Sequence, residues 1–446
     1  MKRNSIYIFC LAILSITISC KPKETKDVVQ STSLTISDDS LLTHVQYQTF
    51  QYFWDNAEPV SGLAKERTHM DDLTNDKNIV TSGGSGFGLM AILVGIERGF
   101  ITRQQGFERL THMVNFLDTC DRFHGVWSHW INGETGKVKP FSPKDDGGDI
   151  VETAYLVQGL LTVREYFKNG NGDEKALASK IDKIWREVEW DWYTNKKDVL
   201  YWHWSPKHQW AMNFAIGGYN ECLIAYVLSA SSPTHSIKPE VYHKGWARND
   251  SIKTDRQYYG LPTLVDHFEH SDEPVGPLFW AQYSYLGLNP KNLKDRYADY
   301  WKVNQNQSLI IYQYCVDNPK GYKGYGPDCW GLTSSYSIDG YAGHSPSYDL
   351  GVISPTAALS SFPYTPKESM QMLKFLYAPE RDSLIGTYGP YDAFSFSSNW
   401  MLPRYLAIDQ GPIPVMIENY RTGLLWNLFM ASPEVQQGLT KLGFTY

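Results

Sequence analysis

The chain has 446 residues and a formal net charge of −7 at pH 7, and it contains no long run of Lys or Arg. Such a chain is unsuited to binding nucleic acid, which depends on a basic patch that meets the phosphates. Its length exceeds that of an ordinary domain, yet no Pro- or Ser-rich linker interrupts it after residue 38.

Residues 1–19 have the pattern of a secretion signal. Lys2 and Arg3 provide the positive start, and the apolar core that follows is too short and wrongly flanked for a spanning helix. The small residue directly before Cys20 resembles a bacterial lipoprotein cleavage site, which predicts Cys20 as the lipidated first residue. Loss of Lys2 and Arg3, without loss of an acid, changes the net charge from −7 to −9. Ordinary cleavage nearby, with Cys20 as an incidental thiol, is the alternative.

Residues 20–38 are polar and lack aromatic side chains, which is typical of a flexible tether. Residues 39–446 are expected to form a single folded domain. The chain is therefore predicted to be a monomeric lipoprotein of the periplasm or the cell surface. Its contact with the membrane would be made only by the lipid on Cys20.

Within this domain, a segment rich in Gly, Pro, Asp or Ser leads six times into a run that is apolar on nearly every side. The six apolar runs are 89–96, 150–161, 222–228, 277–288, 356–362 and 415–428. A helix that is apolar all round is a buried helix. The runs follow one another at roughly 60–70 residues, which is too long for a solenoid repeat and long enough for two helices and their loops. An all-α fold is predicted, with an inner ring of six helices inside an outer ring.

The expected outer helices look different, because their apolar residues form a one-sided stripe at helical spacing. They cover residues 41–56, 103–118, 173–190 and 366–377. Strand-like alternation is sparse, as in residues 199–204. The loops that feed the inner helices should gather at one end of the ring, so polar residues in those loops would share one cavity.

Four cysteines follow Cys20, and their spacing is not that of a metal site. We expect neither a metal nor another cofactor. Cys315 and Cys329 could pair in an oxidising compartment, while Cys222 lies in a buried-helix pattern and is expected to be inert.

Aromatic residues make up 14% of the chain, and many stand in loops beside polar residues. Flat apolar rings with a polar rim suit sugars, which offer C–H groups on one face and hydroxyl groups at the edge. Core packing is the alternative explanation. The candidates for sugar contact are Trp127, His129, Trp130, Trp204, Tyr219, Trp330, His344 and Gln410.

Glycoside hydrolysis requires two carboxyl groups that flank the scissile bond, one protonated and one able to activate water. The densest acidic segment is residues 145–152, which leads into the second apolar run and contains Asp145, Asp149 and Glu152. Asp149 and Glu152 face the same side of a first helical turn, and like charges at that distance raise one pKa. The same spacing also fits a capping box, which would be purely structural.

Glu221 stands between a Gly-Gly-Tyr-Asn segment and an all-apolar run, with no Lys or Arg within eight residues on either side. A carboxyl group in an apolar wall should have a raised pKa, which suits a general acid. A helix-start glutamate stabilised by the helix dipole is the alternative.

Asp409 precedes the last apolar run, in a loop stiffened by Pro412 and Pro414. A well-solvated loop aspartate would stay ionised and suit a general base. The alternative is a turn-forming aspartate. Glu418 and Arg421 on the same helix are expected to form a supporting ion pair.

Three segments together, residues 145–154, 217–221 and 409–412, resemble the glucoamylase-like family of Bacteroidetes lipoproteins, glycoside hydrolase family 144. The resemblance spans residues 40–446. It implies an (α/α)6 toroid with long loops at the mouth of the active site. It also implies inverting hydrolysis of β-1,2-glucan, by endo-cleavage or by release of sophorose.

The family's acidic cluster corresponds to Asp145, Asp149 and Glu152, its candidate general acid to Glu221, and its candidate base to Asp409. Three alternatives remain: an α-glucan hydrolase of the glucoamylase type, a polysaccharide lyase, and a glycan-binding lipoprotein without activity. A lyase for uronates would favour a basic cleft, which this acidic chain does not suggest.

Overall fold

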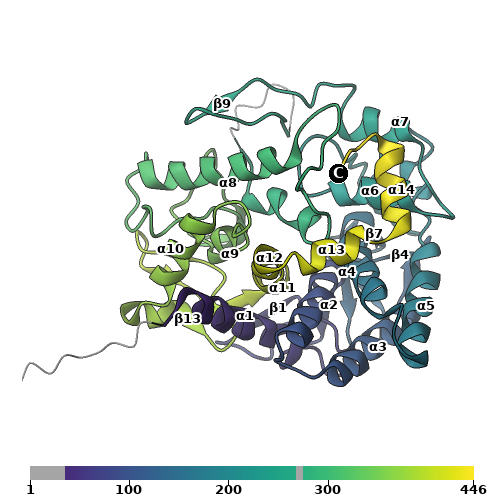
Figure 1. The fold of residues 1–446 in the computed structure, drawn as a ribbon, viewed down its shortest axis with the longest axis horizontal. Coiled ribbons are helices and arrows are strands. Elements are labelled where there is room, and N and C mark those ends of the chain that lie inside the picture. Colours follow the sequence, from purple (N-terminus) through teal and green to yellow (C-terminus); the bar gives the residue numbers. More distant parts are fainter. Residues whose placement is uncertain (1–35, 268–274) are drawn as a thin grey trace, which may run out of the picture. The chain divides into compact units, whose positions relative to one another are not determined.

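The structure is a computed structural model that describes residues 36–267 and 275–446 (Figure 1). The predicted signal peptide, Cys20 and nearly all of the tether lie outside the described residues. One compact unit spans Asp38–Tyr446. Among the described residues, no helix combines the length and the apolar character needed to cross a bilayer.

Five of the six apolar runs form buried α-helices, as predicted. They are α2 (Ser82–Glu97), α4 (Ile150–Phe167), α6 (Leu223–Ser231), α9 (Pro355–Leu359) and α12 (Pro412–Arg421). All nine residues of α6 are buried. The last run is split, because Gly423 adopts a left-handed conformation (φ 74°) and a separate helix, α13 (Leu424–Met430), follows it.

The prediction of an α-helix over residues 277–288 is wrong. This segment forms two 3₁₀ turns, η3 (Leu278–Ala281) and η4 (Tyr283–Tyr285). Gln282 between them leaves the helical region, and its amide donates to Ala357 O and Ser361 Oγ of the neighbouring segment, both at 3.0 Å. Tertiary hydrogen bonds therefore replace the regular helix that the apolar pattern favoured.

The one-sided helices lie outside the buried ones (Figure 1). They are α1 (Asp38–Trp54), α3 (Arg103–Thr119), α5 (Gly172–Arg186), α8 (Tyr300–Asp317), α10 (Pro366–Leu376) and α14 (Pro433–Leu442). Capping boxes start α3 at Thr102 and α5 at Asn171. Helix α3 packs on α2, α5 on α4, α14 on α6 and α10 on α9. Among the buried helices, α4 contacts both α2 and α6, and α12 contacts both α2 and α9.

The strands are short, and three antiparallel pairings place site residues. Strand β1 (Arg67–His69) pairs with β17 (Arg404–Leu406), β2 (Ile79–Thr81) with β5 (Trp130–Asn132), and β7 (Gly148–Asp149) with β8 (His203–Trp204). The other strands are β3 (Arg122–Phe123), β4 (Val126–Trp127), β6 (Val138–Lys139), β9 (Gln257–Tyr258), β10 (Leu261–Pro262), β11 (Ser334–Ser337), β12 (Gly340–Gly343), β13 (Ile385–Gly386), β14 (Gly389–Pro390), β15 (Phe394–Ser395) and β16 (Trp400–Met401). The short helical elements are η1 (Trp192–Thr194), α7 (Pro239–Val241), η2 (Tyr242–Trp246), η5 (Pro379–Leu384) and α11 (Ala407–Gln410).

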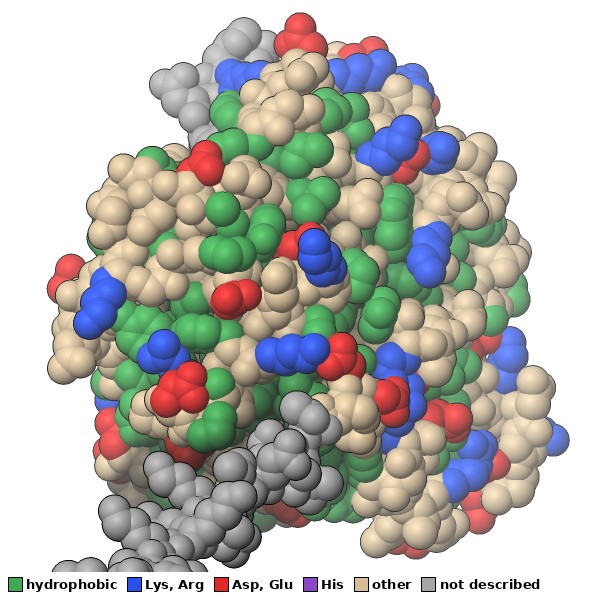
Figure 2. All heavy atoms as spheres, turned by 60° about the vertical axis from the view of Figure 1, so that its left-hand side comes forward, with side chains coloured by type: hydrophobic (Ala, Val, Ile, Leu, Met, Phe, Trp, Pro, Cys, Tyr) green, Lys and Arg blue, Asp and Glu red, His purple; other side chains and the backbone are tan. Residues whose placement is uncertain are grey.

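Two expectations about side-chain pairs are corrected by the structure. Cys315 and Cys329 are both free, buried thiols, so they do not pair. Glu418 forms its ion pair with Arg98 (2.6 Å), while Arg421 reaches Asp39 (2.6 Å). On the face shown in Figure 2, acidic and basic side chains are interspersed with hydrophobic ones.

Helices α2 and α4 cross at two glycines that allow their backbones to touch. A Cβ atom on Gly86 would lie 2.3 Å from Tyr155 O, and one on Gly159 would lie 2.2 Å from Gly86 O. No real Cβ contact is that short, so a side chain at either position would push the two helices apart. This contact sets the distance between the N-terminal ends of α2 and α4, where the acidic cluster lies.

Replacement of Gly86 by Ala should lower the free energy of unfolding by about 1–3 kcal/mol, because a core this dense cannot absorb an added methyl group. Thermal or urea unfolding of the purified variant measures the change. Gly172→Ala is the matched control, because a Cβ there meets no atom within 4 Å. Equal stability of both variants would show that the crossing tolerates a wider spacing.

Candidate active site

A cavity of about 470 Å³ contains three of the predicted site residues: His129, Asp145 and Glu221. Its apolar walls are Phe141, Trp202, Met212, Phe214 and Trp280, and its other polar groups are Ser142, His203, Asn220 and His267. The volume and the mixture of aromatic walls with a few convergent polar groups are those of a small-ligand site.

Glu221 enters the cavity from the segment that leads into α6. Gly218 makes this turn possible, because its φ is +81° and a Cβ atom would lie 1.8 Å from His267 O. Asn220 then accepts a hydrogen bond from Cys222 N at 2.9 Å, which turns the chain into the helix. The backbone carbonyl of Glu221 accepts a hydrogen bond from Ser284 Oγ. The carboxyl group is thus held by a braced backbone.

Burial raises the pKa of Glu221 to about 7. The negative charges of Glu152 and Asp149 act in the same direction, since they also disfavour ionisation. The expectation from the apolar sequence around Glu221 therefore agrees with the structure.

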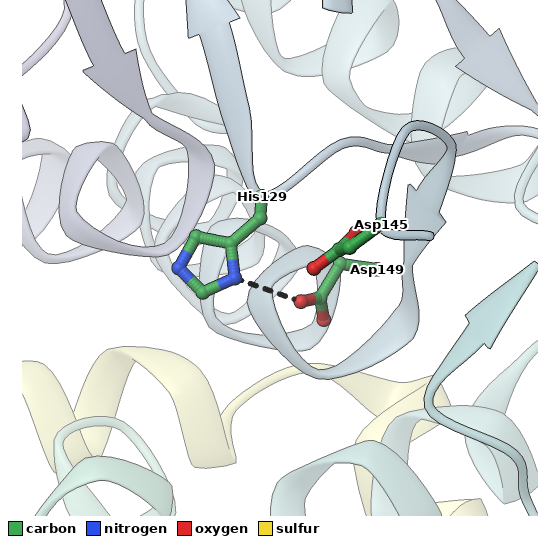
Figure 3. Close-up of side chains that lie close together, drawn as sticks. All are labelled: His129, Asp145 and Asp149. Carbon is green, nitrogen blue, oxygen red and sulfur yellow. Dashed lines mark hydrogen bonds and ion pairs between the residues drawn. The ribbon is translucent and has the colours of Figure 1, made fainter. Parts of the chain in front are cut away.

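Asp149, which is fully buried, is the centre of a charge cluster at the cavity wall (Figure 3). Its Oδ1 caps α4 by accepting from Val151 N (3.0 Å) and Glu152 N (2.9 Å). Its Oδ2 lies 3.0 Å from Nδ1 of His129 and 3.5 Å from Nε2 of His203. Both oxygens are therefore occupied, which leaves Asp149 no free lone pair aimed at a substrate.

His203 also contacts Asp145, with Nε2 3.1 Å from Oδ2. The pairing of β7 with β8 explains this geometry, because Asp149 stands directly opposite His203 in the register. Two carboxylates and two imidazoles thus meet at the wall of the cavity.

The charges in this cluster stabilise one another. Burial opposes the protonated form of His129 and His203, but the nearby carboxylates outweigh it and raise the pKa of each imidazole to about 9. Burial likewise acts to raise the pKa of Asp149, but hydrogen bonds from both imidazoles hold it below its usual value. At neutral pH the cluster holds two imidazolium ions.

Glu152 does not close a capping box. Its Oε2 instead accepts from Gly83 N (2.9 Å) and Thr81 Oγ1 (3.1 Å) at the start of α2. Gly83 is required there, because a Cβ atom would lie 2.3 Å from that oxygen. Burial raises the pKa of Glu152. Glu152 therefore links the first turns of α2 and α4.

Asp409 differs from its prediction as a solvated, ionised loop residue. It lies in α11, it is 2% exposed, and Tyr283 donates a hydrogen bond to its Oδ1 at 3.2 Å. Burial and the adjacent Asp392 raise the pKa of Asp409 well above its usual value. Asp392 is itself buried, and burial raises its pKa to about 6.

Glu66 connects the two groups of acids. Its backbone carbonyl accepts from Ala407 N at 3.0 Å, and Arg67 pairs with its carboxylate. Burial raises the pKa of Glu66, whereas the charge of His129 lowers it, and Glu66 in turn raises the pKa values of Asp392 and Asp409. The acids of the site therefore act on one another electrostatically.

Five of the predicted sugar contacts are buried and do not line this cavity. Trp127 donates to Leu117 O, Trp330 to Glu368 O, Tyr219 to Asn304 Oδ1 and Gln410 to Pro390 O, while His344 bonds Ser337 and Thr333. Each uses its polar atom to tie core elements together, which is the ordinary role of a buried aromatic or amide side chain.

Trp204 is turned toward Trp192, whose ring it meets edge-on at 5.8 Å, rather than toward the cavity. Trp130 is partly exposed and contacts Phe141, which stacks on His129 at 4.2 Å. Trp130 therefore stands at the rim.

Sequence reasoning missed several functional candidates. Trp202, His203 and Trp280 line the cavity, and Glu66 and Asp392 act on Asp409. Trp202 and His203 lie in residues 199–204, where the sequence shows strand-like alternation, and the strand register, not the composition, decides which side chain faces the cavity. Glu66 and Asp392 stand in no pattern that distinguishes them from surface acids.

His129, Asp145 and Asp149 are also ligand types for a divalent cation, and their ligand atoms lie within 4.8 Å of one another. In the structure, the imidazoles of His129 and His203 compensate the two aspartates. The expectation that the protein needs no metal stays a prediction.

NMR titration of the imidazole groups should show His129 and His203 losing their protons near pH 9, and His344 titrating near pH 4, because burial lowers the pKa of His344.

The pH dependence of stability follows from the same shifts. Because the folded-state pKa of His129 and of His203 lies above 6.5, both groups stabilise the fold fully below pH 6.5, and this contribution is lost as the pH rises through about 9. Stability measured at pH 7 and at pH 10 should therefore differ. Titration of His129 below pH 7 would contradict the ion-paired cluster.

Known proteins are similar to this chain in both sequence and fold. A family model described as "Putative glucoamylase" matches residues 213–433. The endo-β-1,2-glucanase of Chitinophaga pinensis, solved with sophorotriose and glucose, is 61% identical and superposes with a TM-score of 0.90. That match covers 92% of this chain and 99% of the glucanase. A "putative glucoamylase" from Bacteroides caccae is 58% identical with a TM-score of 0.89, over 92% of this chain and 100% of that one.

A curated relative is the exo β-1,2-glucooligosaccharide sophorohydrolase (non-reducing end) of Parabacteroides distasonis, 44% identical over 431 residues. The match covers 93% of this chain, which spans 59% of the length of that relative. Identity of 61% over nearly the whole of a solved relative places the chain in one family with it. The chain belongs to the glucoamylase-like family, glycoside hydrolase family 144.

Proposed function

We propose that this chain is an inverting glycoside hydrolase that cleaves β-1,2-glucan, either within the polymer or with release of sophorose. The observation that carries the proposal is Glu221, a braced carboxyl group in an aromatic cavity with a pKa of about 7. Relatives named as β-1,2-glucan hydrolases at 61% and 44% identity support the substrate class.

Glu221 would act as the general acid. A carboxyl group with a pKa near 7 is largely protonated in neutral solution, and it can give its proton to the glycosidic oxygen as the bond breaks. Asp149, with both oxygens occupied, would hold His129 and His203 in place and keep negative charge near Glu221. Glu152 would have the same supporting role.

The proton acceptor would lie on the side of Asp409. The ring of Tyr283, which donates to Asp409, meets the ring of Tyr155 edge-on at 5.7 Å, and the Tyr155 hydroxyl lies 3.5 Å from Glu221 O. Two tyrosines therefore connect the backbone of Glu221 to the carboxyl group of Asp409. Inverting hydrolysis requires a second carboxyl group apart from the acid, with room between them for the water that attacks the anomeric carbon.

The aromatic walls would hold the sugar rings. Trp202 and Trp280 line the cavity on the Glu221 side. Tyr341, in β12 opposite Tyr336 of β11, is exposed and lies within electrostatic reach of Asp409 and Asp392. Rings on both sides of the acids would let a glucan chain lie across the site.

We also infer that the helices form the (α/α)6 double ring expected from the sequence. Ile224 N donates to Ser284 Oγ at 3.0 Å, which joins α6 to η4, and Gln282 joins the η3–η4 segment to α9. With the contacts of α9, α12, α2, α4 and α6, each inner segment has an inner neighbour on both sides.

Export with a lipid anchor at Cys20 stays part of the proposal, since the signal-like segment lies outside the described residues. A hydrolase tethered by residues 20–38 would act on glucan at a membrane surface.

Glu221→Gln should lower kcat on β-1,2-glucan by about 10²- to 10⁴-fold while the substrate still binds, because the amide cannot donate the proton. The wild-type rate should fall as the pH rises above about 7, where Glu221 loses its proton. Product analysis with NMR of the released anomer tests both the linkage and the inversion. Glu418→Gln is the control, since Glu418 is a buried acid that pairs with Arg98 outside the cavity. An unchanged kcat in Glu221→Gln would contradict the assignment of Glu221 as the general acid.

Cys20→Ala should release the protein from the membrane fraction and abolish incorporation of labelled palmitate in a bacterial host. Full-length wild-type protein is the reference. Labelling that persists in the variant would contradict lipidation at Cys20.

A further inference from the structure

We propose that Asp392 and Asp409 form a proton-sharing carboxyl pair, in which Asp392 is a positioning residue that controls the charge of Asp409. The proposal rests on the proposed function for its role in catalysis, although the pair itself is a property of the fold. Asp392 has no role in the assignments made from the sequence.

The geometry of the pair is built by the backbone. Tyr336 N donates to Asp392 Oδ2 at 2.7 Å, and Asp392 N donates to Arg404 O at 3.0 Å. Gln410, next to Asp409, donates to Pro390 O at 2.9 Å and so ties α11 to the loop that carries Asp392. Both carboxyl groups are therefore held in place by separate elements.

The two carboxyl groups are buried and interact with one another. Asp392 and Asp409 are 4% and 2% exposed, and their carboxyl groups are within hydrogen-bonding reach of one another. Asp392 Oδ1 and Asp409 Oδ2 have no other partner. Two ionised carboxylates are acceptors only and repel one another, so a buried contact of this kind is stable when one proton lies between them.

The surroundings favour one proton and one negative charge on the pair. The groups that face it are Glu66, Tyr283 and Tyr341, and none of these is a cation. Arg67 is engaged by Glu66, and Arg404 pairs with Asp71 at 3.1 Å. Burial raises the pKa of Asp392 to about 6 and raises that of Asp409 well above its usual value, so the pair holds one proton and one negative charge near neutral pH.

With this arrangement, the proton of the attacking water is accepted by two carboxyl groups together rather than by Asp409 alone. Glu221 gives a proton to the glycosidic oxygen, water attacks the anomeric carbon, and the proton of that water passes to the pair. The pair then holds two protons and no charge, and it returns one proton to solvent while Glu221 is reprotonated. The accepting unit is thus the pair, whose negative charge depends on Asp392.

The test compares pH profiles of kcat/KM for the full chain, Asp392→Asn and Asp349→Asn. The wild type should lose activity on the acidic side near pH 6. In Asp392→Asn the carboxylic acid that donates to the single negative charge is replaced by a weaker amide donor, while Asp409 stays buried, so the acidic limb should move up, by up to about one pH unit, a tenfold change in the ionisation constant. Asp349 is an equally buried aspartate bound by Tyr314 and Tyr325, and its variant should keep the wild-type limb. Lower activity with an unmoved limb would overturn the proposal.

A second measurement needs no substrate. Carbon NMR of aspartate-labelled wild-type protein should show a protonated aspartate at pH 7, and this signal should vanish in both Asp392→Asn and Asp409→Asn. Independent titration of all aspartates below pH 4.5 would overturn the pair. If the wild-type protein shows the protonated-aspartate signal but does not hydrolyse β-1,2-glucan, the proposed function is refuted and the carboxyl pair is not.

Discussion

The close crossing of α2 and α4 is the constraint on which the site depends. Gly86 and Gly159 let the two backbones touch, and this spacing brings Gly83 N at the start of α2 to the carboxylate of Glu152 in the first turn of α4. Asp149 caps the same turn and holds His129 and His203. A wider crossing would separate Glu152 from α2 and loosen the wall next to Glu221. The positions of the charged groups in the site therefore depend on how α2 and α4 pack.

The carboxyl groups of the site differ in pKa because each has different hydrogen-bond partners. Asp149 receives hydrogen bonds on both oxygens and stays ionised, whereas burial of Glu221 outweighs the hydrogen bonds from its own backbone and from Cys222, so Glu221 holds its proton up to a pKa of about 7. Asp392 and Asp409 have only each other for their last oxygens. Under the proposed function, these three environments would supply a proton donor, a fixed charge and a proton acceptor, and glycoside hydrolysis requires a donor and an acceptor.

Prediction from the sequence succeeded where a local pattern has one physical meaning. Apolar runs became buried helices, and one-sided stripes became outer helices with ends within a few residues of those expected. It failed where two meanings compete. The run at residues 277–288 is apolar, but Gln282 gives up helical geometry to bond α9. Trp127, Trp330 and His344 stand beside polar residues in sequence, yet each is buried and bonds the core.

The sequence by itself determined the helical class, the buried helices, the unusual setting of Glu221 and the acidic start of α4, because burial and capping leave periodic and local marks. Only the tertiary structure decided which acids share a proton and which aromatic rings face the cavity. Nothing in the sequence around Glu66 or Asp392 marks either residue as part of the site. Both raise the pKa of Asp409 because the folded chain brings them close to it. The pKa of a carboxyl group depends on partners and burial in three dimensions, and no one-dimensional pattern contains that information.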